Sequence, residues 1–229
     1  MEVILTENPK EKAGQALTAA LRRHAGKPIL LMVSGGSAFS LLDFVEPSVL
    51  GPQLTLTVLD ERFSSDPAIN NFAQLEQSDF YQTSIKRGVK TIPTKVLVGD
   101  SLQSLRNRFD TALHTWKEQN EDGVIMATMG IGSDGHTAGI LPGEHEVDFN
   151  GDAWVVGYSV PKEVNQYTER VTVTNTFLRS QVTSAIAYAV GHDKYQLVQK
   201  IQSTDASVQE MPACIFKEMA SFALFTSQI

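Results

Sequence analysis

Apolar runs alternate along the chain with segments in which apolar residues recur every three or four positions. Charge-free runs rich in β-branched residues are typical of strands buried on both faces of a parallel sheet, whereas the longer repeat is typical of amphipathic helices. These patterns predict strands at residues 3–5, 28–33, 54–59, 95–99, 123–128, 153–157, 170–174 and 183–190. Strands that alternate with helices in this way predict an α/β fold.

Capping residues place the helices between these strands. Asn8 and Pro9 suit the N-cap and first residue of a helix through about residue 25, and Pro47 stops a helical pattern that follows Ser37. Asn70 is a candidate N-cap for a helix through about residue 80. Further helices are predicted after Asp100 or Ser101, with a core stripe of Leu102, Leu105, Phe109, Leu113 and Trp116, after Thr174 or Asn175, and from Lys194 through Ile201.

A glycine-rich stretch at residues 129–143 is the centre of the functional prediction. It follows an apolar strand and delivers Asp134 and His136 to the carboxyl end of that strand, where open α/β sheets bind ligands. Its glycine spacing also matches a dinucleotide fingerprint, but Pro142 breaks the chain before the long helix that such a site needs. The other alternative is that His136 is an ordinary surface histidine. We favour a chemical role, because His136 lies at the end of a strand in a glycine-rich loop, which is costly to order.

The second strand also ends in small residues, Ser34, Gly35, Gly36 and Ser37. A glycine loop between a strand and a helix start leaves N–H groups unpaired, and these can bind an anion such as phosphate. A tight turn with Ser37 as a simple N-cap is an equally good interpretation. The loop lacks the lysine of a Walker motif, so a nucleoside triphosphate is not expected.

Charged residues stand at two further strand ends. Asp60, Glu61 and Arg62 follow the third strand, where their position favours site residues over a solvated turn. Lys194 lies in the first turn of a predicted helix, where a cation opposes the helix dipole unless an anion lies nearby; a solvated lysine is the alternative. Arg170 enters another strand.

These strand ends share one edge if the sheet is parallel, with helices on both faces. The edge would then collect anion-binding amides, the cations Arg62, Arg170 and Lys194, and an Asp134–His136 pair that could activate water. This combination predicts a hydrolase or isomerase that acts on a small phosphorylated molecule.

The composition of the chain narrows the classes of partner that the protein is expected to bind. The chain of 229 residues has a formal net charge of −7, which argues against nucleic-acid binding. A single cysteine, Cys214, excludes internal disulfides, and the five histidines show no zinc-ligand spacing, so a metal is not expected. Without a signal sequence or a run of ~18 apolar residues, we expect a cytoplasmic protein with no membrane partner and a single domain over residues 1–229.

The motifs, taken in order, resemble the 6-phosphogluconolactonase family, which shares its fold with glucosamine-6-phosphate deaminase. The resemblance rests on residues 34–37, 60–62, 70–71, 130–138, 141–143, 170–172 and 191–194. It implies a three-layer αβα fold around a mostly parallel, Rossmann-like sheet. It also implies hydrolysis of 6-phospho-D-glucono-1,5-lactone to 6-phospho-D-gluconate, a step of the oxidative pentose phosphate pathway, without a cofactor.

The resemblance also implies roles for individual residues. His136 would be the general base that activates water, and Asp134 would order the loop or the substrate hydroxyls. The substrate would bind to Ser34, Gly35, Gly36, Ser37, Asp60, Arg62, Gly132, Arg170 and Lys194, with the phosphate on the glycine loop and the cations.

Two other functions remain open. The deaminase family carries a glutamate shortly after the histidine, whereas residues 140–143 here contain no carboxylate, which favours the lactonase. A non-catalytic sugar-phosphate-binding protein is the third candidate, and retention of both Asp134 and His136 argues against it. Ala38, Phe39 and Gly139 depart from the lactonase pattern at the phosphate loop and the central motif.

Overall fold

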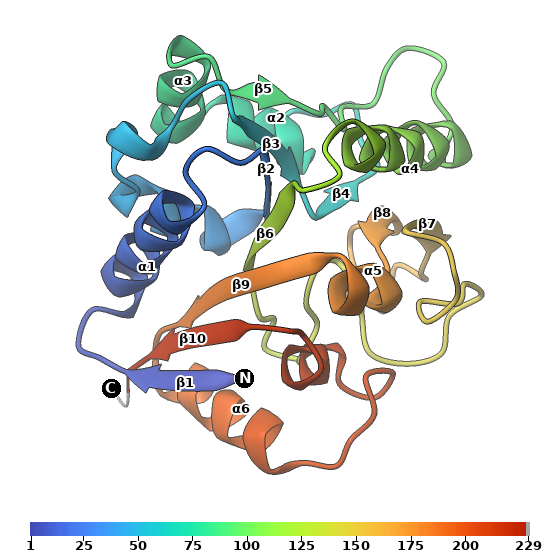
Figure 1. Cartoon of the computed structure of the whole chain (residues 1–229). Helices are drawn as coiled ribbons and strands as arrows, with labels where there is room; N and C mark the ends of the chain where they lie inside the picture. The colour runs from blue at the N-terminus through green and yellow to red at the C-terminus, as the bar shows by residue number, and fades with distance from the viewer. Residues whose placement is uncertain (228–229) are drawn as a thin grey trace.

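A seven-stranded parallel sheet forms the centre of the computed structural model, which describes residues 1–227 (Figure 1). The predicted domain range of 1–229 therefore ends two residues beyond the described part. The strands lie in the order β1 (Glu2–Leu5), β10 (Phe222–Thr226), β9 (Val182–Ala189), β6 (Val124–Met129), β2 (Ile29–Val33), β3 (Leu54–Val58) and β5 (Lys90–Thr91). Each neighbouring pair is parallel, which confirms the predicted fold class.

Helices cover both faces of this sheet, because its strands are apolar on both sides. In β2, Leu30 and Met32 pack into one core and Leu31 and Val33 into the other. The first core contains α4 (Leu102–Gln119), α5 (Asn175–Ser180), α6 (His192–Ser203) and η3 (Pro212–Lys217). The second contains α1 (Pro9–Arg23), η1 (Gly36–Phe44), α2 (Asn71–Glu76) and α3 (Asp79–Lys86), and η2 (Pro47–Val49) borders it. In Figure 1, α1 lies on one side of the sheet and α4 and α5 on the other.

A second, antiparallel sheet lies beside the carboxyl ends of the large one. It consists of β4 (Asp60–Arg62), β8 (Glu169–Val173) and β7 (Val155–Ser159). The charged triplet predicted to end the third strand thus forms a short strand of its own. Backbone hydrogen bonds of Leu59 with Val33 and Val173 join the two sheets at this point.

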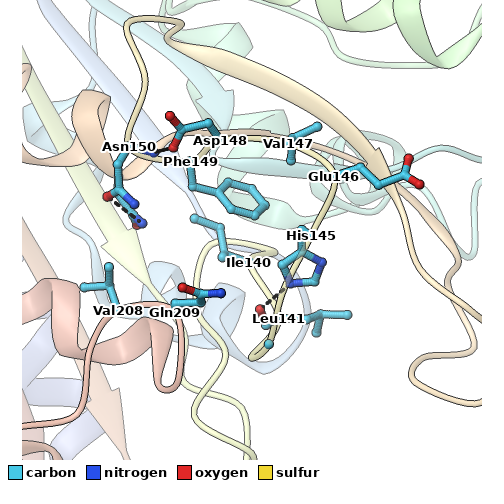
Figure 2. A pocket seen from close by; sticks show the side chains of 12 residues that line it. Ile140, Leu141, His145, Glu146, Val147, Asp148, Phe149, Asn150, Val208 and Gln209 are labelled. Carbon is cyan, nitrogen blue, oxygen red and sulfur yellow. Dashed lines mark hydrogen bonds between the residues drawn. The ribbon is translucent and has the colours of Figure 1, made fainter.

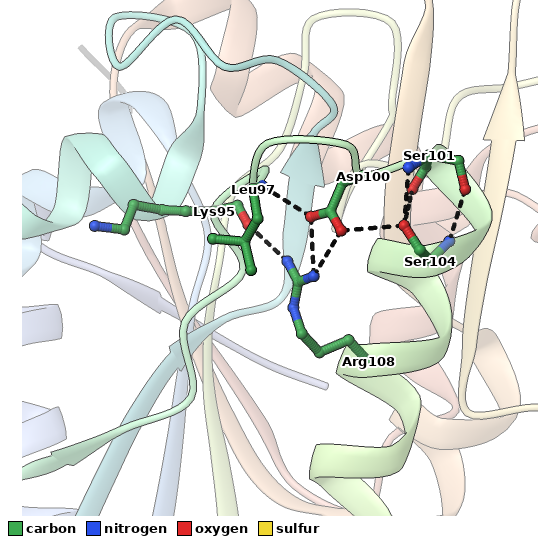
Figure 3. Close-up of polar contacts among 6 residues, drawn as sticks. All are labelled: Lys95, Leu97, Asp100, Ser101, Ser104 and Arg108. Atoms are coloured by element: carbon green, nitrogen blue, oxygen red, sulfur yellow. Dashed lines mark hydrogen bonds and ion pairs between the residues drawn. The ribbon is translucent and has the colours of Figure 1, made fainter.

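The predicted strand at residues 95–99 is wrong. Side chains, not a neighbouring strand, satisfy the backbone here: Arg108 donates to the Lys95 carbonyl at 2.7 Å, and the Asp100 carboxylate accepts from the Leu97 N–H at 2.8 Å (Figure 3). Arg108 also binds both carboxylate oxygens of Asp100 at 2.9 and 3.0 Å. Strand β5, which pairs with β3, was not predicted because its two residues, Lys90 and Thr91, form no apolar run.

Other differences lie in the helices and at the C-terminal end. The segment after Ser37 is a 3₁₀ helix, and its buried Ala38 and Leu41 are spaced to suit three residues per turn. The predicted helix from Asn70 divides at Ser78, which accepts from the Tyr81 N–H and caps a new helix. Strand β10 was not predicted from the sequence. No helix within residues 1–227 has the length and apolarity to cross a lipid bilayer.

Candidate active site

A cavity of about 340 Å³ opens where β2, β3, β6 and β9 end and the small sheet begins. All but two of the residues predicted for the site line it: Ser34, Gly35, Gly36, Ser37, Asp60, Arg62, Gly132, His136, Arg170 and Lys194. The exceptions are Asp134, which contacts His136 from outside the lining, and Glu61, which points away from the cavity. The fold therefore brings together groups that are up to 160 positions apart in the sequence.

The loop after β6 fixes an Asp–His pair at the cavity wall. Asp134 Oδ1 lies 2.6 Å from Nδ1 of His136 and accepts from the His136 backbone N–H at 3.1 Å. This contact holds the pKa of Asp134 down to about 2, so its carboxylate is ionised at neutral pH. A carboxylate accepts at Nδ1, which leaves Nε2 as the nitrogen of neutral His136 that can take a proton.

Gly132 lets this pair form. The backbone folds back so that the Gly132 N–H donates to the His136 carbonyl at 2.8 Å. A Cβ atom at position 132 would lie 2.0 Å from Nδ1 of His136 and 2.6 Å from Oδ1 of Asp134. Only glycine leaves room for both side chains at this point.

Side chains of the small sheet hold the next segment, residues 137–141. Thr172 on β8 donates to the carbonyl of Ala138, whose φ of 46° is in the left-handed region. Tyr158 on β7 donates to the Gly139 carbonyl and accepts from the Leu141 N–H at 3.3 Å. Burial raises the pKa of Tyr158 to about 12, so the hydroxyl stays protonated and can make both bonds.

The segment after β2 lines the cavity with Ser34, Gly35, Gly36 and Ser37. Gly35 occupies the N-cap of η1 and Ser37 lies inside the helix, so the alternative of Ser37 as N-cap is wrong. The first turn of such a helix leaves N–H groups without intrahelical partners, as an anion site requires. Gly36 has a φ of 66° with open space beside it, and the buried Ser34 hydroxyl has no partner.

Cationic side chains converge from two directions. Arg62 on β4 lies opposite Arg170 on β8 in the strand register, and the Arg62 guanidinium lies 4.2 Å from the ring centre of Tyr167. Arg170 is 5% exposed, donates to Asn165 at 3.0 Å and keeps an unpartnered buried Nε. Lys194, in the first turn of α6, donates to the Ile131 carbonyl. Burial lowers the pKa of Lys194, and the Asp134 charge opposes that shift.

Asp60 and Glu61 separate although they are neighbours in the sequence. Asp60 lines the cavity, where burial raises its pKa and Arg170, Arg62 and His136 oppose the rise. Glu61 points to the opposite side of β4, is fully buried and accepts from the N–H groups of Arg62, Asn71 and Phe72 and from the Thr94 hydroxyl. The prediction that Glu61 is a site residue is wrong. Its carboxylate instead anchors the start of α2.

Several cavity residues were missed by the sequence analysis. Asn71, next to the correctly predicted N-cap Asn70, donates from its side chain to the Asp60 carbonyl at 3.0 Å. Asn165, Gln166 and Tyr167 reach the cavity from the connection between β7 and β8. The Asn70–Asn71 pair was a usable signal for Asn71, whereas the connection residues follow no recognisable pattern.

The chain is similar to known proteins both in its sequence profile and in its fold. The profile of the glucosamine-6-phosphate isomerases/6-phosphogluconolactonase family matches residues 4–224. A 6-phosphogluconolactonase from Thermotoga maritima has 16% sequence identity, covers 99% of both chains and gives a TM-score of 0.73. Those from Shewanella baltica and Trypanosoma brucei have 20% and 17% identity, TM-scores of 0.73 and 0.70, and cover 99% of this chain and 96% of their own.

These structural matches show a shared fold at low sequence identity. A search of curated protein sequences gave no match. The family profile, in contrast, spans β1 to β10 and includes every residue that lines the cavity. The protein belongs to the glucosamine-6-phosphate isomerase/6-phosphogluconolactonase family.

Proposed function

We propose that this protein is a 6-phosphogluconolactonase, an enzyme that hydrolyses 6-phospho-D-glucono-1,5-lactone to 6-phospho-D-gluconate. The observation that carries the proposal is the Asp134–His136 pair at the wall of a cavity that also holds Arg62, Arg170 and Lys194. A base beside several cations suits a reactive ester that carries a phosphate. The names of the structurally similar proteins support the same activity.

His136 would act as general base and then as general acid. Its Nε2 takes a proton from water while the water oxygen forms a bond to the lactone carbonyl carbon. The tetrahedral intermediate then expels the ring oxygen, which takes the proton back from His136, so that one water is consumed and the ring ester bond is broken. The ionised Asp134 stabilises the transient imidazolium and keeps the ring in place.

The remaining cavity groups would position the substrate. The N–H groups of Gly35, Gly36 and Ser37 form one side of a phosphate site, and the cations supply the opposite charge. A δ-lactone is already a reactive ester, so positioning and one base suffice for its hydrolysis. Asp60, which is buried near Arg170 and accepts a hydrogen bond from Asn71, would contact the sugar hydroxyls.

We also propose that residues 1–229 form one catalytic domain. The cavity lining runs from Ser34 to Lys194 and draws on the segments after β2 and β6, on α6 and on the small sheet, so a domain boundary between these positions would divide the site.

The test is turnover of the lactone, generated in situ from glucose 6-phosphate, against its uncatalysed hydrolysis. We expect the purified protein to accelerate the reaction, and to act less well on glucono-δ-lactone, which lacks the phosphate. Absence of acceleration by folded protein would refute the lactonase. Release of ammonia from glucosamine 6-phosphate would then identify the deaminase reaction, and its absence would leave a sugar-phosphate-binding protein.

A further inference from the structure

A second cavity, of about 330 Å³, lies on the other side of segment 137–141 (Figure 2). Ile140 and Leu141 line it, whereas Thr137, Ala138 and Gly139 line the candidate active site. The two cavities share no lining residue. A volume near 300 Å³ is at the lower end of the range for small-molecule sites and suits a ligand with one ring.

Aromatic and aliphatic side chains form the walls of this second cavity. Figure 2 shows the Phe149 ring in the middle of the group, with Ile140 and His145 near it. The rings of His145 and Phe149 meet edge to face at 5.5 Å between centroids. The His145 Nε2 lies 2.8 Å from the Leu141 carbonyl oxygen, and because a carbonyl only accepts, this nitrogen carries a proton. These walls suit the face and edge of a planar ring.

One polar group in the wall lacks a partner. Asn175 is 2% exposed, and its Oδ1 is buried without a hydrogen bond. The amide orientation follows from its neighbours: Asn150 Oδ1 accepts from Arg179 at 2.8 Å, so it can face only the donor Nδ2 of Asn175, at 3.4 Å. The free atom of Asn175 is therefore an acceptor, and a ligand N–H would supply the missing bond.

The charges around the cavity are negative. Its lining, within the described residues, includes Glu146 and Asp148 and no lysine or arginine. Arg179, which reaches Asn150, is paired with Glu218 and adds no free positive charge. A phosphate or carboxylate ligand would be repelled, in contrast to the cation-rich active-site cavity.

We propose that this cavity is a second binding site, for a small aromatic amide or amidine, neutral or cationic, that donates an N–H to Asn175. The ligand ring packs against Phe149 and His145, and its amide end faces the Asn175 oxygen. The site does not depend on the proposed catalytic function. Its position against Ile140 and Leu141 makes it a neighbour of the active site, and no group in the catalytic mechanism belongs to it.

Three probes of the same shape test the chemistry: benzamide, benzamidine and benzoate, titrated into isotope-labelled full-length protein and followed by the shifts of backbone amide resonances. A ligand of this size should bind with a dissociation constant of about 1–10 mM. We expect benzamide and benzamidine to shift resonances of residues 140–150 and 175, and benzoate to bind there about tenfold more weakly or not at all. Equal binding of benzoate at these residues, or no shift there with benzamide, would overturn the proposal.

Two variants separate the Asn175 acceptor from general disturbance of the wall. Asn175→Ala removes the oxygen and should weaken benzamide about five- to tenfold. Asn107→Ala makes the same substitution at an exposed position of α4 that does not line the cavity, and should bind benzamide as the unmodified protein does. Should Asn175→Ala fail to fold, Val208→Trp fills the cavity from a half-buried position and should abolish binding. Unchanged binding in Asn175→Ala, or in Val208→Trp, would contradict the proposed site.

Discussion

The large and the small sheet contribute different kinds of group to one cavity. The central strands of the seven-stranded sheet, such as β2 and β6, are apolar and buried, and the polar groups come from the loops and helix starts that follow these strands, such as Gly36, His136 and Lys194. In the small sheet the strands themselves carry the charges, because Asp60, Arg62 and Arg170 are strand residues.

This difference separates the parts of the site that turn geometry positions from the parts that strand pairing positions. A loop side chain depends on turn geometry, as His136 depends on Gly132, whereas a strand side chain is fixed by register and by the pairing of its backbone. We expect substitutions in the loops to damage turnover and substitutions in the small sheet to damage substrate binding or stability.

The largest loss among these is expected for Gly132→Ala. Its Cβ would collide with His136 and Asp134 and displace the base by about an ångström or more, which should reduce kcat about 100-fold or more. Gly130→Ala is the matched control, because a Cβ there meets nothing closer than 3.5 Å. Steady-state kinetics on the lactone compare the two, and equal activity of both variants would contradict the account.

Arg170→Met tests the charge that the small sheet supplies. Methionine fills a similar volume without charge, so KM for the phosphorylated lactone should rise about 10- to 100-fold. Kinetics with glucono-δ-lactone provide the control, since a substrate without phosphate should be affected much less. An equal loss with both substrates would show that Arg170 maintains the structure of the site instead.

Glu61→Gln should affect stability more than catalysis. A glutamine amide would face N–H donors that the carboxylate now satisfies, which should lower the free energy of unfolding by about 1–3 kcal/mol. Glu46→Gln, which breaks an exposed pair with Arg22, should cost about 1 kcal/mol or less in the same urea denaturation.

The pH dependence of unfolding gives a second test of Glu61. Burial raises its pKa from 4.5 to about 7, so the folded protein favours the protonated form. The stability this contributes is complete below about pH 4.5 and is lost as pH rises to about 7, and Glu61→Gln should remove that part of the pH dependence. An unchanged pH slope in the variant would contradict the role assigned to burial.

The smallest effect is expected for Asp134→Asn, which keeps the shape of the loop but removes the charge beside His136. Turnover should fall about tenfold. Because the pKa of Asp134 is about 2, its carboxylate is ionised at pH 7, and the variant removes a full negative charge from beside the base at that pH. Steady-state kinetics on the lactone at pH 7 compare the two proteins, and an unchanged kcat in the variant would contradict the role assigned to Asp134.

The sequence predicted best where local chemistry decides the structure. Charge-free apolar runs identified β2, β3, β6 and β9, and capping residues identified the starts of α1, α2 and α4. The loop motif around His136 predicted which residues meet, because consecutive parallel strands end at one edge of the sheet.

Prediction from the sequence failed where tertiary contacts determine the local structure. The backbone at residues 95–99 is satisfied by Asp100 and Arg108, a contact that no periodicity encodes. The orientation of Glu61 away from the cavity follows from the formation of β4, a pairing with β8 more than one hundred residues away. Tyr167 enters the site only through the loop that this second sheet positions.

The most direct test of the central claim is the turnover of His136→Ala on 6-phospho-D-glucono-1,5-lactone, with the unmodified protein alongside and circular dichroism to show that both are folded. We expect acceleration by the unmodified protein and a fall in kcat of about 10²- to 10⁴-fold in the variant. A folded His136→Ala protein that hydrolyses the lactone as fast as the unmodified protein would contradict the role of His136 as general base.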